Sequence, residues 1–168
     1  MPADAAVCED IWTYERVPGR RLVLPWSAPG LPGGHVQLDF VFNEPLPAAP
    51  EPADVAGVRL PAATRELSLA WKLVWLATDS YPQGKDLYDA VLLAESCAAP
   101  YELLHTVFRD SGEFFPPVPW VRKLDLDAFS EVEWADWDTF AAEYPGIPGS
   151  ASSYAERLLT ALAPSFAE

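Results

Sequence analysis

The chain has 168 residues, half of them hydrophobic, and a formal net charge of −14 at pH 7. This length and apolar content exclude a wholly disordered chain and predict one sizeable hydrophobic core. The net charge argues against broad binding to nucleic acid, DNA included, or to an anionic membrane, although a local basic site could be built from the 11 Lys and Arg residues. Acidity of this kind usually serves solubility.

Cysteine usage and the N-terminus bear on the compartment. Cys8 and Cys97 lie far apart and match no metal or redox spacing. The N-terminus lacks the basic and apolar regions of a signal peptide. The longest apolar run, residues 67–77, is too short to cross a bilayer and contains Lys72. We therefore predict a cytoplasmic protein with reduced thiols and no membrane segment.

The first third of the chain predicts strands. Residues 1–9 read as a frayed start, and β-branched and aromatic runs predict strands at 11–17, 21–26 and 35–42. A turn at Pro18-Gly19 and a loop over 27–34 would join these strands into an antiparallel meander. The Pro/Ala-rich segment 45–52 predicts an extended linker without a ladder, followed by one more short strand over 57–60.

From Thr64, a candidate N-cap, the pattern is helical. Residues 114–120 are proline-rich and predict irregular structure. The predicted helices cover residues 66–78, 85–95, 101–109, 131–143, and a last stretch from Ser150 or Ser152 to 162. Strands first and helices after predict an α+β fold. In this interpretation a small, mostly antiparallel sheet in residues 1–62 precedes a helical bundle in residues 63–168, and both pack as a single domain.

Lys72 is the first candidate functional residue. It lies in a helix that is apolar on nearly every side, and a buried ammonium requires a carboxylate partner or a phosphate. Alternatively, its head reaches solvent or pairs with one core aspartate. The following helix opens with Lys85, Asp86 and Asp89, whose spacing places the charges on one face. Such carboxylates also favour a helix N-terminus, but a helix hairpin would bring Lys72 close to Asp86 or Asp89.

Asp39 is the second candidate. It interrupts an apolar strand, where aspartate is disfavoured, so it either faces solvent or is held for a purpose. A strand carboxylate is one way to bind Mg²⁺, which prefers oxygen ligands. Weaker candidates are His35 and His105, which lack partners at a metal or triad spacing, and Trp134 and Trp137, which mark either core or an interface patch.

Together, Lys72, the segment Lys85-Asp86-Leu87-Tyr88-Asp89 and a strand bearing Asp39 resemble the AbiEii/AbiGii toxin family of nucleotidyltransferases from type IV toxin–antitoxin and abortive-infection systems. The resemblance covers residues 20–97. It implies a motif lysine at Lys72, a [RK]-D-x-x-D signature at Lys85, Asp86 and Asp89, and a metal-binding strand carboxylate at Asp39. It also implies a nucleoside triphosphate substrate, Mg²⁺, an RNA or protein acceptor and a cognate antitoxin.

The chain departs from the family pattern at one motif. No G-[GS] turn leads to the D-x-D pair that the resemblance implies for the first strand, since Gly33-Gly34 leads to Asn43-Glu44. One strand carboxylate cannot build a two-metal site. We therefore expect a truncated or degenerate family member, or a site completed by a second chain that pairs with the exposed sheet edge.

Three hypotheses follow for the function. The first is a nucleotidyltransferase-like toxin, with Asp39, Lys72 and Asp86 in catalysis, Lys72, Lys85 and Asp89 binding the nucleotide, and Asp39 holding the metal. The second is a non-catalytic nucleotide- or protein-binding module derived from that fold. The third is a structural domain whose Lys–Asp pairs are ion pairs only.

Overall fold

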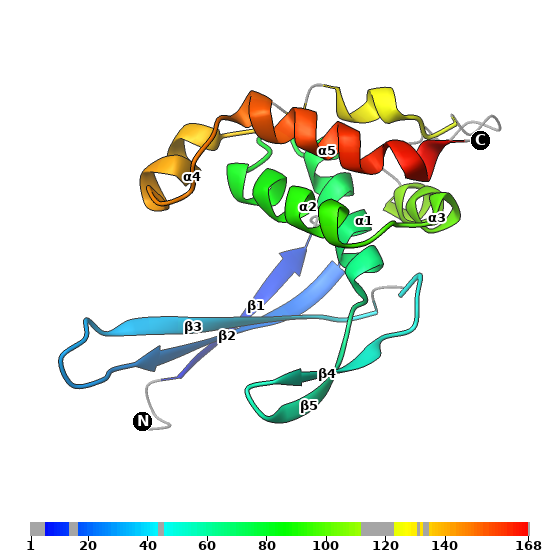
Figure 1. The fold of residues 1–168 in the computed structure, drawn as a ribbon. Coiled ribbons are helices and arrows are strands. Elements are labelled where there is room, and N and C mark those ends of the chain that lie inside the picture. The colour runs from blue at the N-terminus through cyan, green and yellow to red at the C-terminus, as the bar shows by residue number, and fades with distance from the viewer. Residues whose placement is uncertain are drawn as a thin grey trace. The chain divides into compact units, whose positions relative to one another are not determined.

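A computed structural model describes residues 6–13, 17–43, 46–111, 123–130, 132 and 135–167. Over these residues the fold is α+β, as predicted, with strands first and helices after (Figure 1). The chain forms two compact units, Met1–Leu46 and Pro47–Glu168. The predicted packing of residues 1–62 and 63–168 as one domain stays a prediction.

The first unit holds a three-stranded antiparallel sheet in the order β1-β2-β3. Its strands are β1 (Val7–Thr13), β2 (Val17–Trp26) and β3 (Gly34–Val41). This order confirms the predicted meander. The first strand begins at Val7, inside the segment predicted to be frayed, because its residues 7–13 pair in register with residues 23–17 of β2.

The predicted turn at Pro18-Gly19 is wrong, because both residues lie inside β2 opposite Trp12 and Ile11. Gly19 permits a close approach between strands: a Cβ there would lie 2.6 Å from the carbonyl oxygen of Phe40. Close approach of a neighbouring backbone, and not a turn, therefore explains the glycine inside this strand.

The second unit opens with a two-stranded hairpin, β4 (Glu51–Val55) and β5 (Val58–Ala62). Its two-residue turn has positive φ angles of 52° at Ala56 and 81° at Gly57, as a type I′ turn requires. The side chain of Asp54 accepts a hydrogen bond from the Gly57 N–H at 2.9 Å. The prediction of a linker without a ladder through residue 52 is therefore wrong, because Pro52 pairs with Pro61 in this hairpin. Neither proline has an N–H to donate to the ladder.

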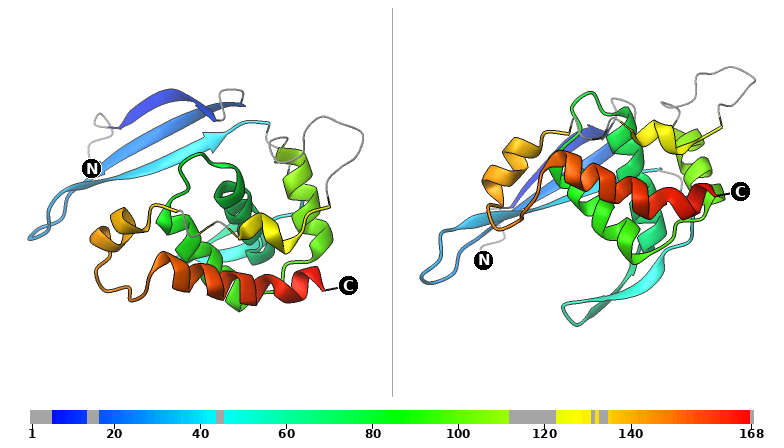
Figure 2. Two further views of the ribbon diagram at one scale, coloured as in Figure 1. Left: turned by 90° about the horizontal axis from the view of Figure 1, so that it is seen from above. Right: turned by 45° about the horizontal axis from the view of Figure 1, so that its top comes forward.

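Helices dominate the remaining described residues of the second unit (Figures 1 and 2). They are α1 (Arg65–Thr78), α2 (Gly84–Ser96), α3 (Tyr101–Ser111), the 3₁₀ helix η2 (Leu126–Phe129), α4 (Trp137–Glu143) and α5 (Ala151–Phe166). The predicted N-caps are confirmed at Thr64, which accepts from Leu67 N–H, and at Ser150, which forms a capping box with Ser153. The helix predicted over 131–143 begins at Trp137, where Asp136 caps it.

The hydrophobic core lies among these helices. It packs α1 against α2 and α3, and α2 against α5 and α4. Leu69, Leu73, Leu87, Leu104 and Leu158 are each fully buried at its centre. Residues 114–120 and Trp134 lie outside the described residues, so the predictions about them stay predictions. No helix in the described part of the chain combines the length and apolarity needed to span a bilayer.

Candidate functional site

The centre of the candidate site is Lys72, in the middle of α1. Six of the 14 residues of α1 are buried in the core: Leu67, Leu69, Ala70, Leu73, Val74 and Leu76. Helix α2 follows after a short turn and packs against α1, as the predicted pair of helices requires. This packing brings the first turns of α2, which carry its charged residues, alongside Lys72.

Lys72 binds both aspartates of α2. Its Nζ lies 2.7 Å from Oδ1 of Asp86 and 3.0 Å from Oδ2 of Asp89. The Lys72 and Asp86 side chains are each only 16% exposed, so this is a partly desolvated ion cluster. Lys85 adds a second cation, with its Nζ 3.3 Å from the same Oδ2 of Asp89, but its side chain is 58% exposed. The structure thus gathers the four helical residues singled out from the sequence into one cluster.

The environment keeps Lys72 charged. Burial lowers the pKa of Lys72, but hydrogen bonds and attraction from Asp86 and Asp89 outweigh it, so the net effect is a raised pKa. The Trp75 ring lies 5.1 Å from Nζ and adds a cation–π interaction. An ammonium has three N–H donors, and the two carboxylates occupy two of them. Among the described residues, the carboxylates therefore leave one N–H of Lys72 without an oxygen partner.

A backbone contact anchors the start of α2. The Gly84 N–H donates to the carbonyl oxygen of Asp136 at 3.2 Å, and the Asp136 N–H donates to Pro82 at 2.8 Å. A Cβ on Gly84 would lie 2.6 Å from the Asp136 oxygen and 2.9 Å from Cβ of Phe140. Only glycine allows this approach, which sets where Lys85 and Asp86 begin the helix. Sequence reasoning treated Gly84 as part of a turn and assigned Asp136 no role.

Asp39 lies on β3, in the first unit, directly opposite Arg21 on β2. Arg21 binds both of its oxygens, with Nε 2.8 Å from Oδ1 and an Nη 3.0 Å from Oδ2. Gln37 donates a further hydrogen bond to Oδ2 at 3.0 Å. The hydrogen bonds from Arg21 hold the pKa of Asp39 below its usual range. Glu9 faces Arg21 from β1, so the three charges form a row across the sheet.

The Asp39 carboxylate does not fit a Mg²⁺ ion while this pair holds, because the guanidinium occupies both oxygens. Among the residues that the structure describes, no three His, Cys, Asp or Glu side chains are grouped as metal ligands. The assignment of Asp39 as a metal ligand or catalytic residue stays a prediction. Asp39 and the Lys72 cluster belong to different units, and each is described by itself.

The structure describes the surroundings of the weaker candidates Trp137, His105 and His35. Trp137 is buried against Tyr154 and Phe140, with ring centroids 4.5 Å and 5.0 Å apart, and its Nε1 has no hydrogen-bond partner among the described residues. His105 stacks on Tyr101 at 6.0 Å. His35 is exposed on β3.

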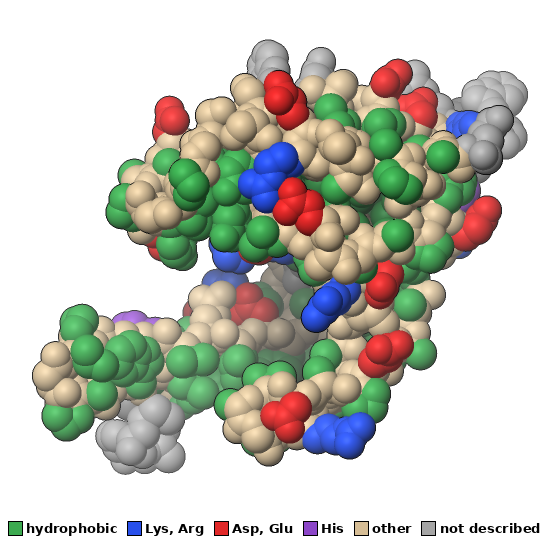
Figure 3. All heavy atoms as spheres, in the orientation of Figure 1, with side chains coloured by type: hydrophobic (Ala, Val, Ile, Leu, Met, Phe, Trp, Pro, Cys, Tyr) green, Lys and Arg blue, Asp and Glu red, His purple; other side chains and the backbone are tan. Residues whose placement is uncertain are grey.

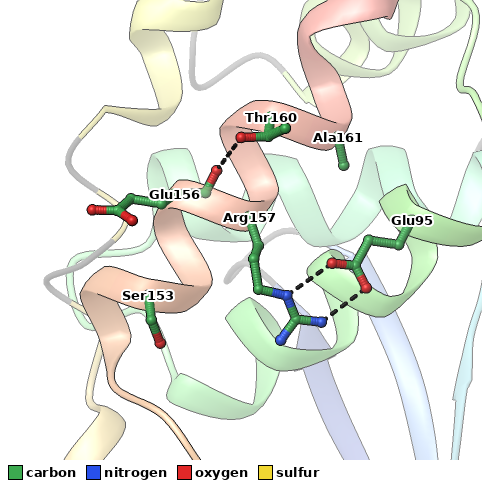
Figure 4. A pocket seen from close by; sticks show the side chains of 6 residues that line it. All are labelled: Glu95, Ser153, Glu156, Arg157, Thr160 and Ala161. Atoms are coloured by element: carbon green, nitrogen blue, oxygen red, sulfur yellow. Dashed lines mark hydrogen bonds and ion pairs between the residues drawn. The ribbon is translucent and has the colours of Figure 1, made fainter.

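An open pocket of about 450 Å³ lies between α2 and α5 (Figure 4). Arg157 points from α5 toward Glu95 on α2 and binds both carboxylate oxygens at 2.8 Å. Arg157 also lies over the Tyr154 ring at 4.6 Å. The ion pair between Arg157 and Glu95 holds α5 against α2. Because the guanidinium is already paired, Arg157 is not a free cation for a ligand in this pocket.

Comparison with known families decides the ancestry. The model of the nucleotidyl transferase AbiEii toxin family, a type IV toxin–antitoxin system, matches residues 3–164. The chain belongs to this family. The match includes both units and every candidate residue discussed above, well beyond residues 20–97, where the motifs lie. Neither a curated protein nor a solved structure matches the chain significantly.

Proposed function

We propose that this AbiEii-family chain binds a nucleoside triphosphate at the Lys72 cluster, with Lys72 and Lys85 directed to its phosphates. Two supports carry the proposal. The family is one of nucleotidyl transferases, and Lys72 is a half-buried cation with an N–H left over after it binds Asp86 and Asp89. The second support is the deciding observation, because Asp86 and Asp89 hold this cation in place while its third N–H can meet a phosphate oxygen.

The two lysines have different roles in this proposal. Lys72 is held rigidly by Asp86 and Asp89, so it supplies a fixed point charge for one phosphate. Lys85 is exposed, and among the described residues it binds Asp89 alone, so it can move toward a second phosphate. Asp86 and Asp89 orient the ammonium groups and limit the loss of side-chain entropy when the nucleotide binds.

Transfer of the nucleotide to RNA or protein, with Mg²⁺ as cofactor, is the full activity that family membership suggests. In this proposal Asp39 would act as a metal ligand only after Arg21 releases it. A cognate antitoxin is the partner suggested by the toxin–antitoxin description of the family. A net charge of −14 opposes broad contact with any nucleic-acid backbone, so an RNA acceptor would have to bind at a local basic site.

One observation favours a second candidate function, a non-catalytic nucleotide-binding module. Both oxygens of Asp39 are held by Arg21 in a cross-strand pair, a structural use of the carboxylate that requires no metal. In this alternative the α1–α2 cluster still binds nucleotide, but no transfer follows.

Nucleotide binding and labelled transfer test the two functions together. The full chain is titrated with each nucleoside triphosphate by calorimetry, and is then incubated with labelled nucleotide, Mg²⁺ and total tRNA. We expect binding that falls at least about tenfold in Lys72→Met, equivalent to about 1.4 kcal/mol. Arg59→Met, an exposed cation on β5, is the matched control and should bind like the wild type.

The transfer assay separates the candidates. Label transfer that disappears in Asp39→Ala supports catalysis, whereas binding without transfer supports the non-catalytic module, which we expect from the pairing of Asp39. Unchanged nucleotide affinity in a folded Lys72→Met variant, or no binding by the wild type, contradicts both and leaves the ion cluster with a structural role.

A further inference from the structure

The outer edge of β3 carries fewer charged side chains than the outer edge of β1. At β1, Glu9 and Asp10 are consecutive residues in the middle of the strand, and they lie against Arg21 and Arg20 of β2. On β3, Asp39 is the only acidic residue, and Arg21 neutralises it. The described residues supply no strand on that side of β3. The edge of β3 therefore lacks the charges that normally block pairing.

The register with β2 determines which backbone groups of β3 point outward. The Phe42 N–H donates to the Pro18 carbonyl at 3.0 Å, which extends the ladder in which Val41 faces Gly19. In an antiparallel ladder, hydrogen-bonded pairs alternate with non-bonded ones. Even-numbered residues of β3 therefore bond to β2. The residues whose N–H and C=O point away from β2 are His35, Gln37, Asp39 and Val41.

The same alternation makes one face of this sheet apolar. Val36, Leu38 and Phe40 point to one side of β3 and are 47%, 42% and 49% exposed. Leu24 and Leu22 on β2 face Val36 and Leu38 on this side. Figure 3 shows hydrophobic side chains at the surface along the β2–β3 hairpin. A further strand on β3 would extend this apolar row while using the outward backbone groups.

We propose that β3 pairs antiparallel with β3 of a second copy of this chain, with Leu38 opposite Leu38 across a twofold axis. In this register every outward residue of one copy meets an outward residue of the other: His35 faces Val41, and Gln37 faces Asp39. On the apolar face, Val36 meets Phe40, a β-branched–aromatic pair of the kind that stabilises sheets.

Charge and shape favour this register over its neighbours. Moving the axis to Asp39 would place two carboxylates directly opposite each other, which is destabilising. Moving it to Gln37 would place Phe40, inside β3, opposite Gly34, which has no side chain to pack, whereas the Leu38-centred register places only Phe42, beyond the end of β3, opposite Gly34. The Leu38-centred register places Asp39 opposite Gln37 of the second copy. Each Gln37 amide donates one N–H to Asp39 of its own strand and has a second N–H for Asp39 of the other copy. A continuous six-stranded sheet results, and the pairing does not depend on nucleotide chemistry.

Light scattering coupled to size exclusion tests the dimer with the full chain over a dilution series. The wild type should show twice the mass of the 18.4 kDa chain. Leu38→Lys places two ammonium groups opposite each other on the axis and should give a monomer. Phe42→Lys is the matched control: Phe42 is 44% exposed, close to the 42% of Leu38, but lies beyond the paired residues, and this variant should remain dimeric.

Cysteine cross-linking tests the register. In a Cys8→Ser, Cys97→Ser background, Leu38→Cys should form an intermolecular disulfide, because opposed residues in a non-hydrogen-bonded pair have Cα atoms about 4.5 Å apart. Gln37→Cys should cross-link far more slowly. Circular dichroism verifies that each variant is folded. A monomeric wild type, or dissociation by Phe42→Lys as well as Leu38→Lys, overturns the β3 pairing, and faster cross-linking at residue 37 overturns the register.

Discussion

Nζ of Lys72 lies 2.7 Å from Oδ1 of Asp86, although 14 residues separate them in the chain. Asp89 closes the cluster from one turn further along α2, with its Oδ2 3.0 Å from the same nitrogen. A single half-buried cation thus joins α1 and α2. Its removal would leave two carboxylates facing each other in a partly desolvated space.

Lys72→Met should lower the free energy of unfolding by about 2 kcal/mol. This loss is smaller than the loss expected on breaking a fully buried ion pair, because the Asp89 side chain is partly exposed to solvent. Urea denaturation followed by circular dichroism measures the change. The control is Lys85→Met, which should change the free energy of unfolding by less than about 0.5 kcal/mol because Lys85 is exposed. Equal losses in the two variants would contradict the assignment of Lys72 as the centre of the cluster.

Alkaline pH should weaken the fold through Lys72. Its pKa is raised in the folded chain above the ordinary value of 10.5, so its contribution is complete below pH 10.5 and is lost as pH rises through the folded value. The urea midpoint of the wild type should therefore fall more steeply above that pH than the midpoint of Lys72→Met. Parallel pH profiles would show that other groups, such as tyrosines, account for the alkaline loss.

Arg21→Ala should release Asp39. The pKa of this carboxyl lies below its ordinary value of 3.8 because of the hydrogen bonds from Arg21, so removing the guanidinium should raise it. A carbon-detected NMR titration of the Asp39 side chain measures the shift. Gln37→Ala removes a weaker partner and should raise the pKa less. An unchanged pKa in Arg21→Ala would mean that the cross-strand pair does not persist in solution.

Gly84→Ala should destabilise the chain by about 2 kcal/mol, because the added methyl group meets backbone and cannot be accommodated by a rotamer change. This loss outweighs the gain of up to about 1 kcal/mol that alanine brings to a helix. Gly146→Ala is the control, since a Cβ there meets nothing within 4 Å. Thermal and urea unfolding compare the two, and a neutral Gly84→Ala would contradict the close contact with Asp136.

Ser150→Ala should cost about 1 kcal/mol, because it removes the hydrogen bond to the Ser153 N–H and breaks the capping box of α5. Ser152→Ala, at an exposed position inside the helix, should be neutral or slightly stabilising. Urea unfolding distinguishes the two serines. The reverse order of effects would place the start of α5 two residues later.

Local patterns in the sequence determined much of this protein. The apolar run around Lys72, the Thr64 cap and the Lys85-Asp86 start are set by neighbours within a turn or two, so α1 and α2 could be predicted. The alternation in residues 35–42 likewise predicted β3 and the α+β class. Family membership also followed from the sequence, because short motifs can be recognised without knowing which residues are in contact.

Contacts between distant segments were decided only by the tertiary structure. The hairpin made Asp86 and Asp89 equally good candidates for Lys72, and only the packed helices showed that both bind it. Gly19 carries the local signal of a turn, and its real use, an approach to Phe40, depends on a strand 21 residues further on. Asp39 and Arg21 became partners through strand register, which no local pattern encodes, because a shift of one residue would turn every side chain to the other face.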